Sequence, residues 1–226
     1  MVTRQHTFEV GEWYHCYSRG IEKHRIFLHK TDYERFEALL YLANAQPTLQ
    51  RSDLGERNLK EILELPRRDT LVGIGAFCLM PNHFHLLIKE TSENSISNFM
   101  LKLMTAYSMY FNVRYKHQGA VFARPYRSRH VSDDRYFQQV IAYIHLNPAE
   151  LFESEWKKGI VKDYVELQQN LEAYPYSSLI AYENSENHLI NILDKEVFSV
   201  YEPKDLSQTV GDAYAYYQEW RGEPSP

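Results

Sequence analysis

The chain has 226 residues, of which 44% are apolar and 24% charged, and its formal net charge is −5. This length can bury one sizeable core, and the composition excludes a largely disordered chain. No apolar run approaches the roughly 20 residues of a membrane-spanning helix, and no apolar signal segment follows Met1–His6, so we expect no membrane association. Cys16 and Cys78 have neither metal-ligand spacing nor a disulfide framework, which favours a cytoplasmic protein.

The charge is unevenly distributed. No acidic residue occurs between Asn94 and Ser132, whereas this stretch contains six basic residues: Lys102, Arg114, Lys116, Arg124, Arg127 and Arg129. A local basic strip can bind phosphate whatever the total charge. The same pattern is also typical of an ordinary solvated face, and the charge alone leaves both interpretations open.

Up to residue 89, the hydrophobic patterns predict strands and one substantial helix. A polar stretch separates these elements. It resembles an insertion and contains a short predicted helix near Leu59–Leu65. In chain order the expected elements are a strand at Trp13–Ser18, a helix at Asp32–Ala45, the insertion at Gln46–Thr70, and a hairpin of Leu71–Met80 and His83–Lys89 around Pro81 and Asn82.

The remaining patterns predict mostly helices. Pro125 lies in a strand predicted at Val121–Val131 and would place this strand at a sheet edge, because proline cannot donate a ladder hydrogen bond. The helix before Pro148 has a buried stripe at Phe137, Val140, Ile141 and Ile144. The expected elements are a helix at Ile96–Phe111 that Gly119 ends, a strand at Val121–Val131, a helix from Ser132 to Pro148, a turn at Tyr174–Ser178 and a helix at Val210–Trp220.

A histidine pair, His83 and His85, lies on the second strand of the hairpin. Residues two apart on a strand point to the same face, so both imidazoles project together while Phe84, Leu86 and Ile88 pack into the core. Two neutral imidazoles on one face can chelate a divalent ion. The alternative is two histidines on a solvated strand face.

The helix before Pro148 contains Tyr143 and Asn147, one turn apart and therefore on one face. That face flanks the apolar stripe, which predicts that Tyr143 lies at the edge of a groove. Its hydroxyl would then reach a phosphate, and the Asn147 amide oxygen would be a third metal ligand. Alternatively, Tyr143 is a packing residue, as most of the 18 tyrosines must be, and Asn147 is only a helix end before proline.

These two motifs, in this order and spacing, resemble the single-tyrosine transposases of the HUH superfamily, and most closely the REP-associated branch. The resemblance covers about Gly11 to Pro148 and is looser beyond. It rests on Cys78–Ile88 and Tyr143–Pro148, supported by Ser18–Gly20, Ala106–Asn112 and Gly119–Phe122. Asn147 stands where the small-insertion-sequence branch has glutamine, and asparagine matches the REP-associated branch.

The resemblance implies an α+β fold, a central antiparallel sheet with helices packed on it, of the ferredoxin-like HUH nuclease type. We expect a nuclease domain at 8–150, with the insertion at 46–70, and a mainly helical extension at 151–226. The implied activity is cleavage of single-stranded DNA beside an imperfect hairpin, by a monomer or a homodimer.

In this mechanism Mg²⁺ or Mn²⁺, held by His83, His85 and Asn147, polarises a phosphate, and Tyr143 attacks it to form a 5′-phosphotyrosine. Tyr136 is the rival nucleophile on the same helix flank. The residues expected to bind DNA are Arg19, Lys116, Arg124, Tyr126, Arg127 and Arg129, with Tyr126 stacking on unpaired bases.

The sequence allows two other functions. A non-catalytic regulator that binds DNA hairpins would keep the fold without needing the histidines and the tyrosine. A hydrolytic metalloenzyme would need a carboxylate beside the histidine pair, but the nearest one, Glu90, points away from both histidines on a regular strand.

Overall fold

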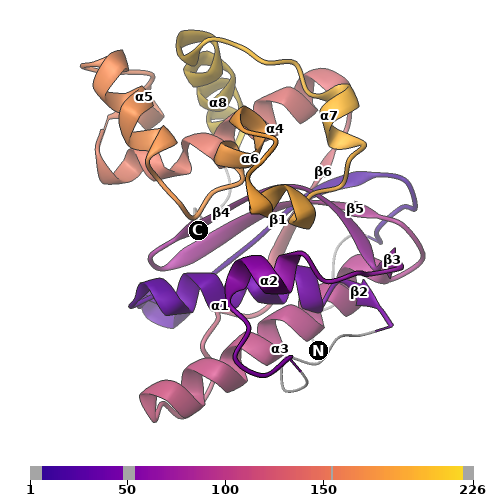
Figure 1. Cartoon of the computed structure of the whole chain (residues 1–226). Helices are drawn as coiled ribbons and strands as arrows, with labels where there is room; N and C mark the ends of the chain where they lie inside the picture. The colour runs from indigo at the N-terminus through magenta and orange to yellow at the C-terminus, as the bar shows by residue number, and fades with distance from the viewer. Residues whose placement is uncertain (1–6, 48–53, 154, 221–226) are drawn as a thin grey trace.

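A four-stranded antiparallel sheet forms the centre of the computed structural model, which describes residues 7–47, 54–153 and 155–220. The strand order is β4-β5-β1-β6. The strands are β1 (Trp13–Arg19), β4 (Val72–Met80), β5 (His83–Glu90) and β6 (Arg127–Val131). Helices cover both faces, so the predicted α+β class with a central antiparallel sheet is confirmed (Figure 1).

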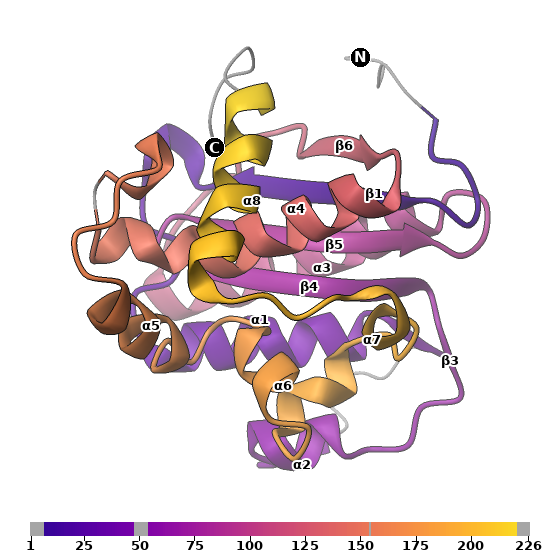
Figure 2. The same ribbon diagram turned by 90° about the horizontal axis from the view of Figure 1, so that it is seen from above.

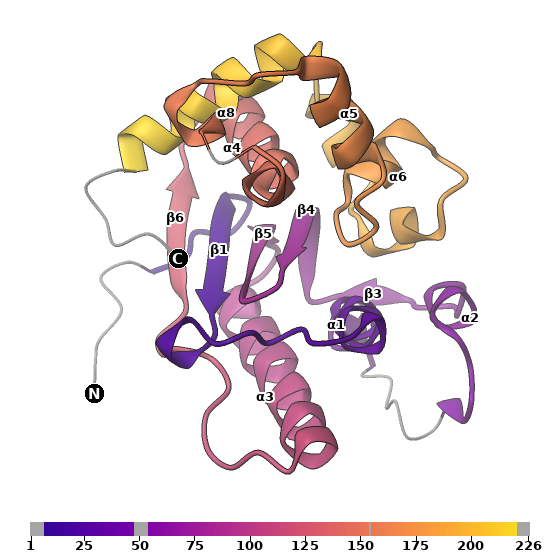
Figure 3. The same ribbon diagram turned by 90° about the vertical axis from the view of Figure 1, so that its left-hand side faces the viewer.

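One face of the sheet is covered by α1 (Lys30–Leu42) and α3 (Ser95–Tyr115), and the other by α4 (Asp134–Leu146) and the C-terminal helices. Figure 3 shows these layers with the sheet seen along its edge. The further helical elements are η1 (Ile21–Lys23), α2 (Leu59–Leu63), η3 (Asn147–Leu151), η4 (Trp156–Lys158), α5 (Tyr164–Glu172), α6 (Leu179–Glu183), η5 (His188–Ile192), α7 (Val197–Val200) and α8 (Leu206–Trp220).

Two hydrophobic cores lie on the two faces of the sheet, and the alternation along β5 divides its side chains between them. Phe84, Leu86 and Ile88 belong to the core under α1 and α3, as predicted. Leu87 belongs to the core under α4. The intervening odd-numbered positions therefore place His83 and His85 on the α4 side.

The predicted insertion is a small appendage at the edge of the fold. It contains α2 and a two-stranded ladder of β2 (Ala45–Gln46) and β3 (Asp69–Thr70). Its residues 48–53 lie outside the described residues, as do Met1–His6 and residues 221–226 of the expected extension. The strand predicted at Val121–Val131 is shorter, because only Arg127–Val131 pairs along β1, at the sheet edge where Pro125 had placed it.

The C-terminal segment contributes to the α4-side core. Helix α8 packs against α4 and crosses over it, as Figure 2 shows from above, and it buries Val210, Ala213 and Tyr216 there. Further back, the amide of Leu79 on β4 donates to the carbonyl of Tyr176 at 2.9 Å, so the predicted turn segment also borders the sheet. None of the helices in the described part of the chain is long and apolar enough to cross a lipid bilayer.

Candidate functional site

The two histidines of β5 lie side by side under α4. Their ring centroids are 5.1 Å apart with perpendicular planes. His85 is fully buried and His83 nearly so, because α4 and the C-terminal segment cover this face of the sheet. The shared strand face is confirmed, but it is a buried face and not the solvated one of the alternative interpretation.

A neighbouring amide sets the orientation of His83. Its Nδ1 lies 2.7 Å from Oδ1 of Asn82, whose Nδ2 donates to the carbonyl of Lys23 at 3.3 Å. An amide oxygen only accepts, so Nδ1 of His83 carries the proton. The lone pair of the neutral ring is then on Nε2, which is the nitrogen that can bind a metal ion.

A third histidine, His15 on β1, contacts His85. Its Nε2 lies 2.8 Å from Nδ1 of His85, and its Nδ1 lies 2.6 Å from the hydroxyl of Tyr216 on α8. His15 is fully buried, and burial lowers its pKa to about 3, with the charge of Arg129 acting in the same direction. Neither His15 nor Tyr216 was predicted from the sequence to belong to the site.

Helix α4 brings Tyr143 to the histidines. The Tyr143 ring lies 5.5 Å from the His85 ring and 5.9 Å from the His15 ring, each measured between centroids. Asp133 starts this helix, because its side chain accepts a hydrogen bond from the amide of Tyr136 at 2.8 Å. The strand and the helix predicted from the two motifs therefore meet at one place.

Asn147 lies one turn after Tyr143 and is fully buried. Its Nδ2 donates to the Tyr143 carbonyl at 2.9 Å, and its Oδ1 accepts no hydrogen bond from any described residue. Burial lowers the pKa of His83 and raises the pKa of Tyr143, and the nearby Asn147 amide acts against both shifts. Asn147 also keeps helical backbone angles, φ −53° and ψ −39°, although a residue before proline disfavours them.

The site is closed over Tyr143. Its side chain is fully buried, whereas the sequence predicted the edge of a groove. Three aromatic rings surround it, with centroids 5.0 Å away for Tyr216, 6.0 Å for Trp156 and 6.4 Å for Tyr217. The groove prediction was wrong because these residues come from η4 and α8, which cover the α4 flank.

Burial dominates the electrostatics of the site. It lowers the pKa of His83 to about 4 and that of His85 well below its usual range, and it raises the pKa of Tyr143. The charge of Glu150, which pairs with Lys157 at 2.8 Å, raises the pKa of both His83 and Tyr143. At neutral pH the histidines are therefore neutral and able to act as ligands.

These residues fit a divalent ion bound by nitrogen and amide oxygen. Each histidine has its Nδ1 engaged in a hydrogen bond, which leaves Nε2 for coordination, and Oδ1 of Asn147 is a buried acceptor that lacks a described donor. Within the described residues no group of three His, Cys, Asp or Glu side chains could hold a metal. The third protein ligand would therefore be the amide.

Glu90 takes no part in this site. Its carboxylate is buried at the far end of β5, where it accepts from the amides of Ser95 and Ile96 at the start of α3. The predicted orientation away from the histidines is confirmed.

A basic cleft of about 270 Å³ opens beside the site, between the end of β1 and the segment before β6. Arg19, Arg124 and Arg127 line it together with Tyr17, whose ring centroid is 5.7 Å from that of His85. Arg124 and Arg127 are exposed. Three of the predicted DNA-binding residues therefore meet next to the histidine pair.

The other predicted DNA-binding residues lie elsewhere. Arg129 Nη2 is 3.7 Å from Oε2 of Glu219 on α8, and its guanidinium lies over the rings of Tyr136 and Tyr216. Tyr126 borders an apolar groove against α3, on the opposite face of the sheet. Lys116 is the exposed residue that ends α3.

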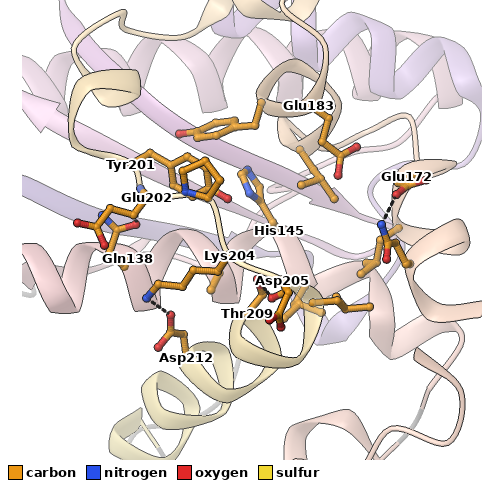
Figure 4. Close-up of a pocket in the computed structure, with 18 residues that line it drawn as sticks. Gln138, His145, Glu172, Glu183, Tyr201, Glu202, Lys204, Asp205, Thr209 and Asp212 are labelled. Atoms are coloured by element: carbon orange, nitrogen blue, oxygen red, sulfur yellow. Dashed lines mark hydrogen bonds and ion pairs between the residues drawn. The ribbon is translucent and has the colours of Figure 1, made fainter. Parts of the chain in front are cut away.

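Another cavity, of about 440 Å³, lies between α4 and the C-terminal segment (Figure 4). Its lining includes Gln138, His145 and an ion pair in which Lys204 Nζ lies 2.6 Å from Asp212 Oδ2. Neither the histidine pair nor Tyr143 lines it, and five acidic side chains do: Glu172, Glu183, Glu202, Asp205 and Asp212. This cavity is therefore unsuited to a phosphodiester backbone.

The chain is similar to known proteins over the span that contains these residues. The family model described as "Transposase IS200 like" matches residues 19–147, which include the histidine pair, Tyr143 and Asn147. A solved structure, "Structure of the REP associates tyrosine transposase bound to a REP hairpin", aligns with 91% of this chain and 93% of its own at 11% identity, with a TM-score of 0.46. No curated protein is significantly similar to the chain.

Proposed function

The chain belongs to the family of IS200-like transposases, and on this premise we propose that it is a metal-dependent endonuclease and strand transferase for single-stranded DNA, with Tyr143 as its nucleophile. The observation that carries the proposal is the meeting of two separate motifs. Tyr143 on α4 lies with its ring 5.5 Å from that of His85 on β5, and Asn147 adds a buried amide oxygen.

In the proposed reaction, His83, His85 and Asn147 would hold Mg²⁺ or Mn²⁺, which would withdraw charge from a phosphate oxygen. Oη of Tyr143 attacks phosphorus and loses its proton, while the bond from phosphorus to the 3′ oxygen breaks and that oxygen takes up a proton. The products are a 5′-phosphotyrosine and a free 3′-hydroxyl. Another 3′-hydroxyl can reverse the step, so the same residues join strands.

The proposed substrate is an unpaired strand beside a DNA hairpin, as the sequence resemblance implies. The basic cleft supports this, because Arg19, Arg124 and Arg127 line it beside Tyr17, whose ring is 5.7 Å from that of His85, and cationic side chains there can bind backbone phosphates. We further propose that the nuclease domain spans 8–150 with the insertion at 46–70, that 151–226 is an extension, and that the protein works in the cytoplasm as a monomer or homodimer.

One observation favours a second candidate, a non-catalytic regulator that binds DNA hairpins. Tyr143, His85 and Asn147 are fully buried, so cleavage requires the side chains of η4 and α8 to move away. A regulator would need no such movement.

An adduct assay separates the two candidates. Labelled single-stranded DNA carrying a hairpin is incubated with the protein and Mn²⁺, and the products are separated in SDS. The proposed nuclease gives an SDS-resistant protein–DNA adduct, which hairpin binding alone does not produce. Retention of the hairpin without any adduct would favour the regulator.

A further inference from the structure

His15 lies between His85 and Tyr216, although the proposed reaction uses neither His15 nor Tyr216. It lies on β1 two residues before Tyr17, so both side chains face α4, and β1 pairs directly with β5. Its ring lies edge to edge with that of His85, with centroids 5.0 Å apart and planes inclined by 29°. A continuous chain of hydrogen bonds joins His85, His15 and Tyr216.

The protons of this chain are set by the metal-binding role of His85. A neutral imidazole has one N–H and one lone pair, so a ring that binds an ion through Nε2 must carry its proton on Nδ1. That proton is donated to Nε2 of His15, 2.8 Å away, which therefore carries the lone pair. His15 then has its own proton on Nδ1 and donates it to the Tyr216 hydroxyl at 2.6 Å.

The opposite arrangement would block the site. If the Tyr216 hydroxyl donated to Nδ1 of His15, then Nε2 of His15 would donate to Nδ1 of His85. His85 would carry its proton on Nε2 and could not bind an ion there. Metal-binding histidines generally donate their second N–H to a fixed acceptor, which holds the tautomer and the ring orientation. Asn82 supplies that acceptor for His83.

We propose that His15 is the corresponding positioning residue for His85: it accepts the Nδ1 proton of His85, which leaves Nε2 of His85 as the metal ligand, while Tyr216 of α8 holds His15 in place. This inference rests on the proposed function, because it concerns the same metal site. It extends the site across two strands and α8, so the C-terminal helix contributes to metal affinity through Tyr216.

Metal binding tests the inference without any cleavage assay. Mn²⁺ is titrated into the purified full-length protein, and free Mn²⁺ is followed by its electron paramagnetic resonance signal. His15→Phe keeps a ring but removes the acceptor, and we expect it to weaken Mn²⁺ binding by about 10- to 100-fold, as for other partners of metal ligands. His15→Gln restores an acceptor near the position of Nε2 and should recover most of the affinity. Tyr216→Phe should cause a smaller loss than His15→Phe.

Two controls separate this effect from general damage. His145 is also buried, but it lies on α4, where its Nε2 is hydrogen-bonded to the Ser178 hydroxyl at 2.8 Å. His145→Phe should therefore lower stability but leave Mn²⁺ affinity unchanged. His85→Ala removes a proposed ligand and defines the affinity without it.

The outcomes distinguish the inference from the proposed function. Loss of binding in His85→Ala, with wild-type affinity in a folded His15→Phe, would overturn the inference alone. Equal binding by wild type and His85→Ala would overturn the metal site itself and the inference with it. Should His15→Phe not fold, long-range ¹H–¹⁵N correlation spectra of the wild-type protein decide. A proton on Nδ1 of His85 supports the inference, and a proton on Nε2 contradicts it.

Discussion

Asn147 donates a hydrogen bond from Nδ2 to the backbone carbonyl of Tyr143 at 2.9 Å, one turn earlier on the same helix. The bond determines which end of the amide faces the histidines, because it turns Oδ1 away from the helix backbone. Oδ1 is then a buried acceptor without a donor among the described residues. Burying an unsatisfied acceptor lowers the free energy of unfolding unless the oxygen binds a cation.

The first prediction is that Asn147→Ala raises the Mn²⁺ concentration needed for half-maximal cleavage, by roughly tenfold if the amide is worth about 1.4 kcal/mol. A water molecule can replace the amide, so the loss at saturating metal should be milder. Asn191→Ala, at an exposed position, is the control. An unchanged metal dependence would leave Asn147 as a helix end only.

The second prediction concerns the two histidines of β5. His83→Ala or His85→Ala should reduce cleavage by roughly a thousandfold or more, because a lost ligand costs several kcal/mol at the transition state. Circular dichroism should show that the fold survives. Near-normal cleavage by either variant at saturating Mg²⁺ would remove these residues from the metal site.

The third prediction separates the arginines of the basic strip. Arg124 and Arg127 border the cleft, so the double variant Arg124→Gln/Arg127→Gln should flatten the log–log salt dependence of single-stranded DNA binding by about 1.4 units, from two phosphates at about 0.7 each. Arg129 pairs with Glu219, so Arg129→Gln should leave the slope nearly unchanged. Equal flattening by Arg129→Gln alone would mean that the backbone follows β6 instead of the cleft.

The fourth prediction is a loss of stability in acid, measured on metal-free protein. Burial lowers the pKa of His145 to about 3 in the folded state, whereas an unfolded histidine titrates near 6.5. Between these values the unfolded chain binds more protons, so the free energy of unfolding falls as the pH falls from about 6.5, by up to roughly 1.4 kcal/mol per pH unit for this group.

Urea unfolding between pH 7 and 5 measures this slope. Because glutamine does not titrate, His145→Gln should take up about one proton fewer on unfolding than the wild type. Identical slopes for the two proteins would mean that His145 binds its proton as readily in the folded state as in the unfolded chain.

The alternation along β5 was enough to predict which side chains enter which core. Phe84, Leu86 and Ile88 lie under α1 and α3, and His83 and His85 lie on the other face. The helical spacing of Tyr143 and Asn147 likewise placed both on one flank of α4. These predictions held because strand and helix periods are local properties of the sequence.

His15 and Tyr216 were missed because their roles depend on contacts distant in sequence. The strand around His15 is aromatic at neighbouring positions, and nothing in its pattern reveals that it pairs with β5 in the register that joins His15 to His85. Tyr216 lies 201 residues after His15 along the chain. The burial of Tyr143 was also not predicted, because the residues that bury it belong to η4 and α8, which are distant from it in the sequence.

The central claim is that Tyr143 is the nucleophile. Tyr136, the rival on the same helix, also packs against Tyr216, with centroids 5.2 Å apart, but it lies under the guanidinium of Arg129. Tyr143→Phe removes only the hydroxyl, so the fold and DNA binding should survive. Tyr136→Phe is the matched control.

Peptide mapping of the protein–DNA adduct formed with Mn²⁺ tests this claim most directly. We predict that the wild-type protein and Tyr136→Phe carry the nucleotide on the peptide containing Tyr143, and that Tyr143→Phe forms no adduct while still binding the hairpin DNA. A nucleotide attached to Tyr136 or Tyr126, or an adduct that persists in Tyr143→Phe, would contradict the account.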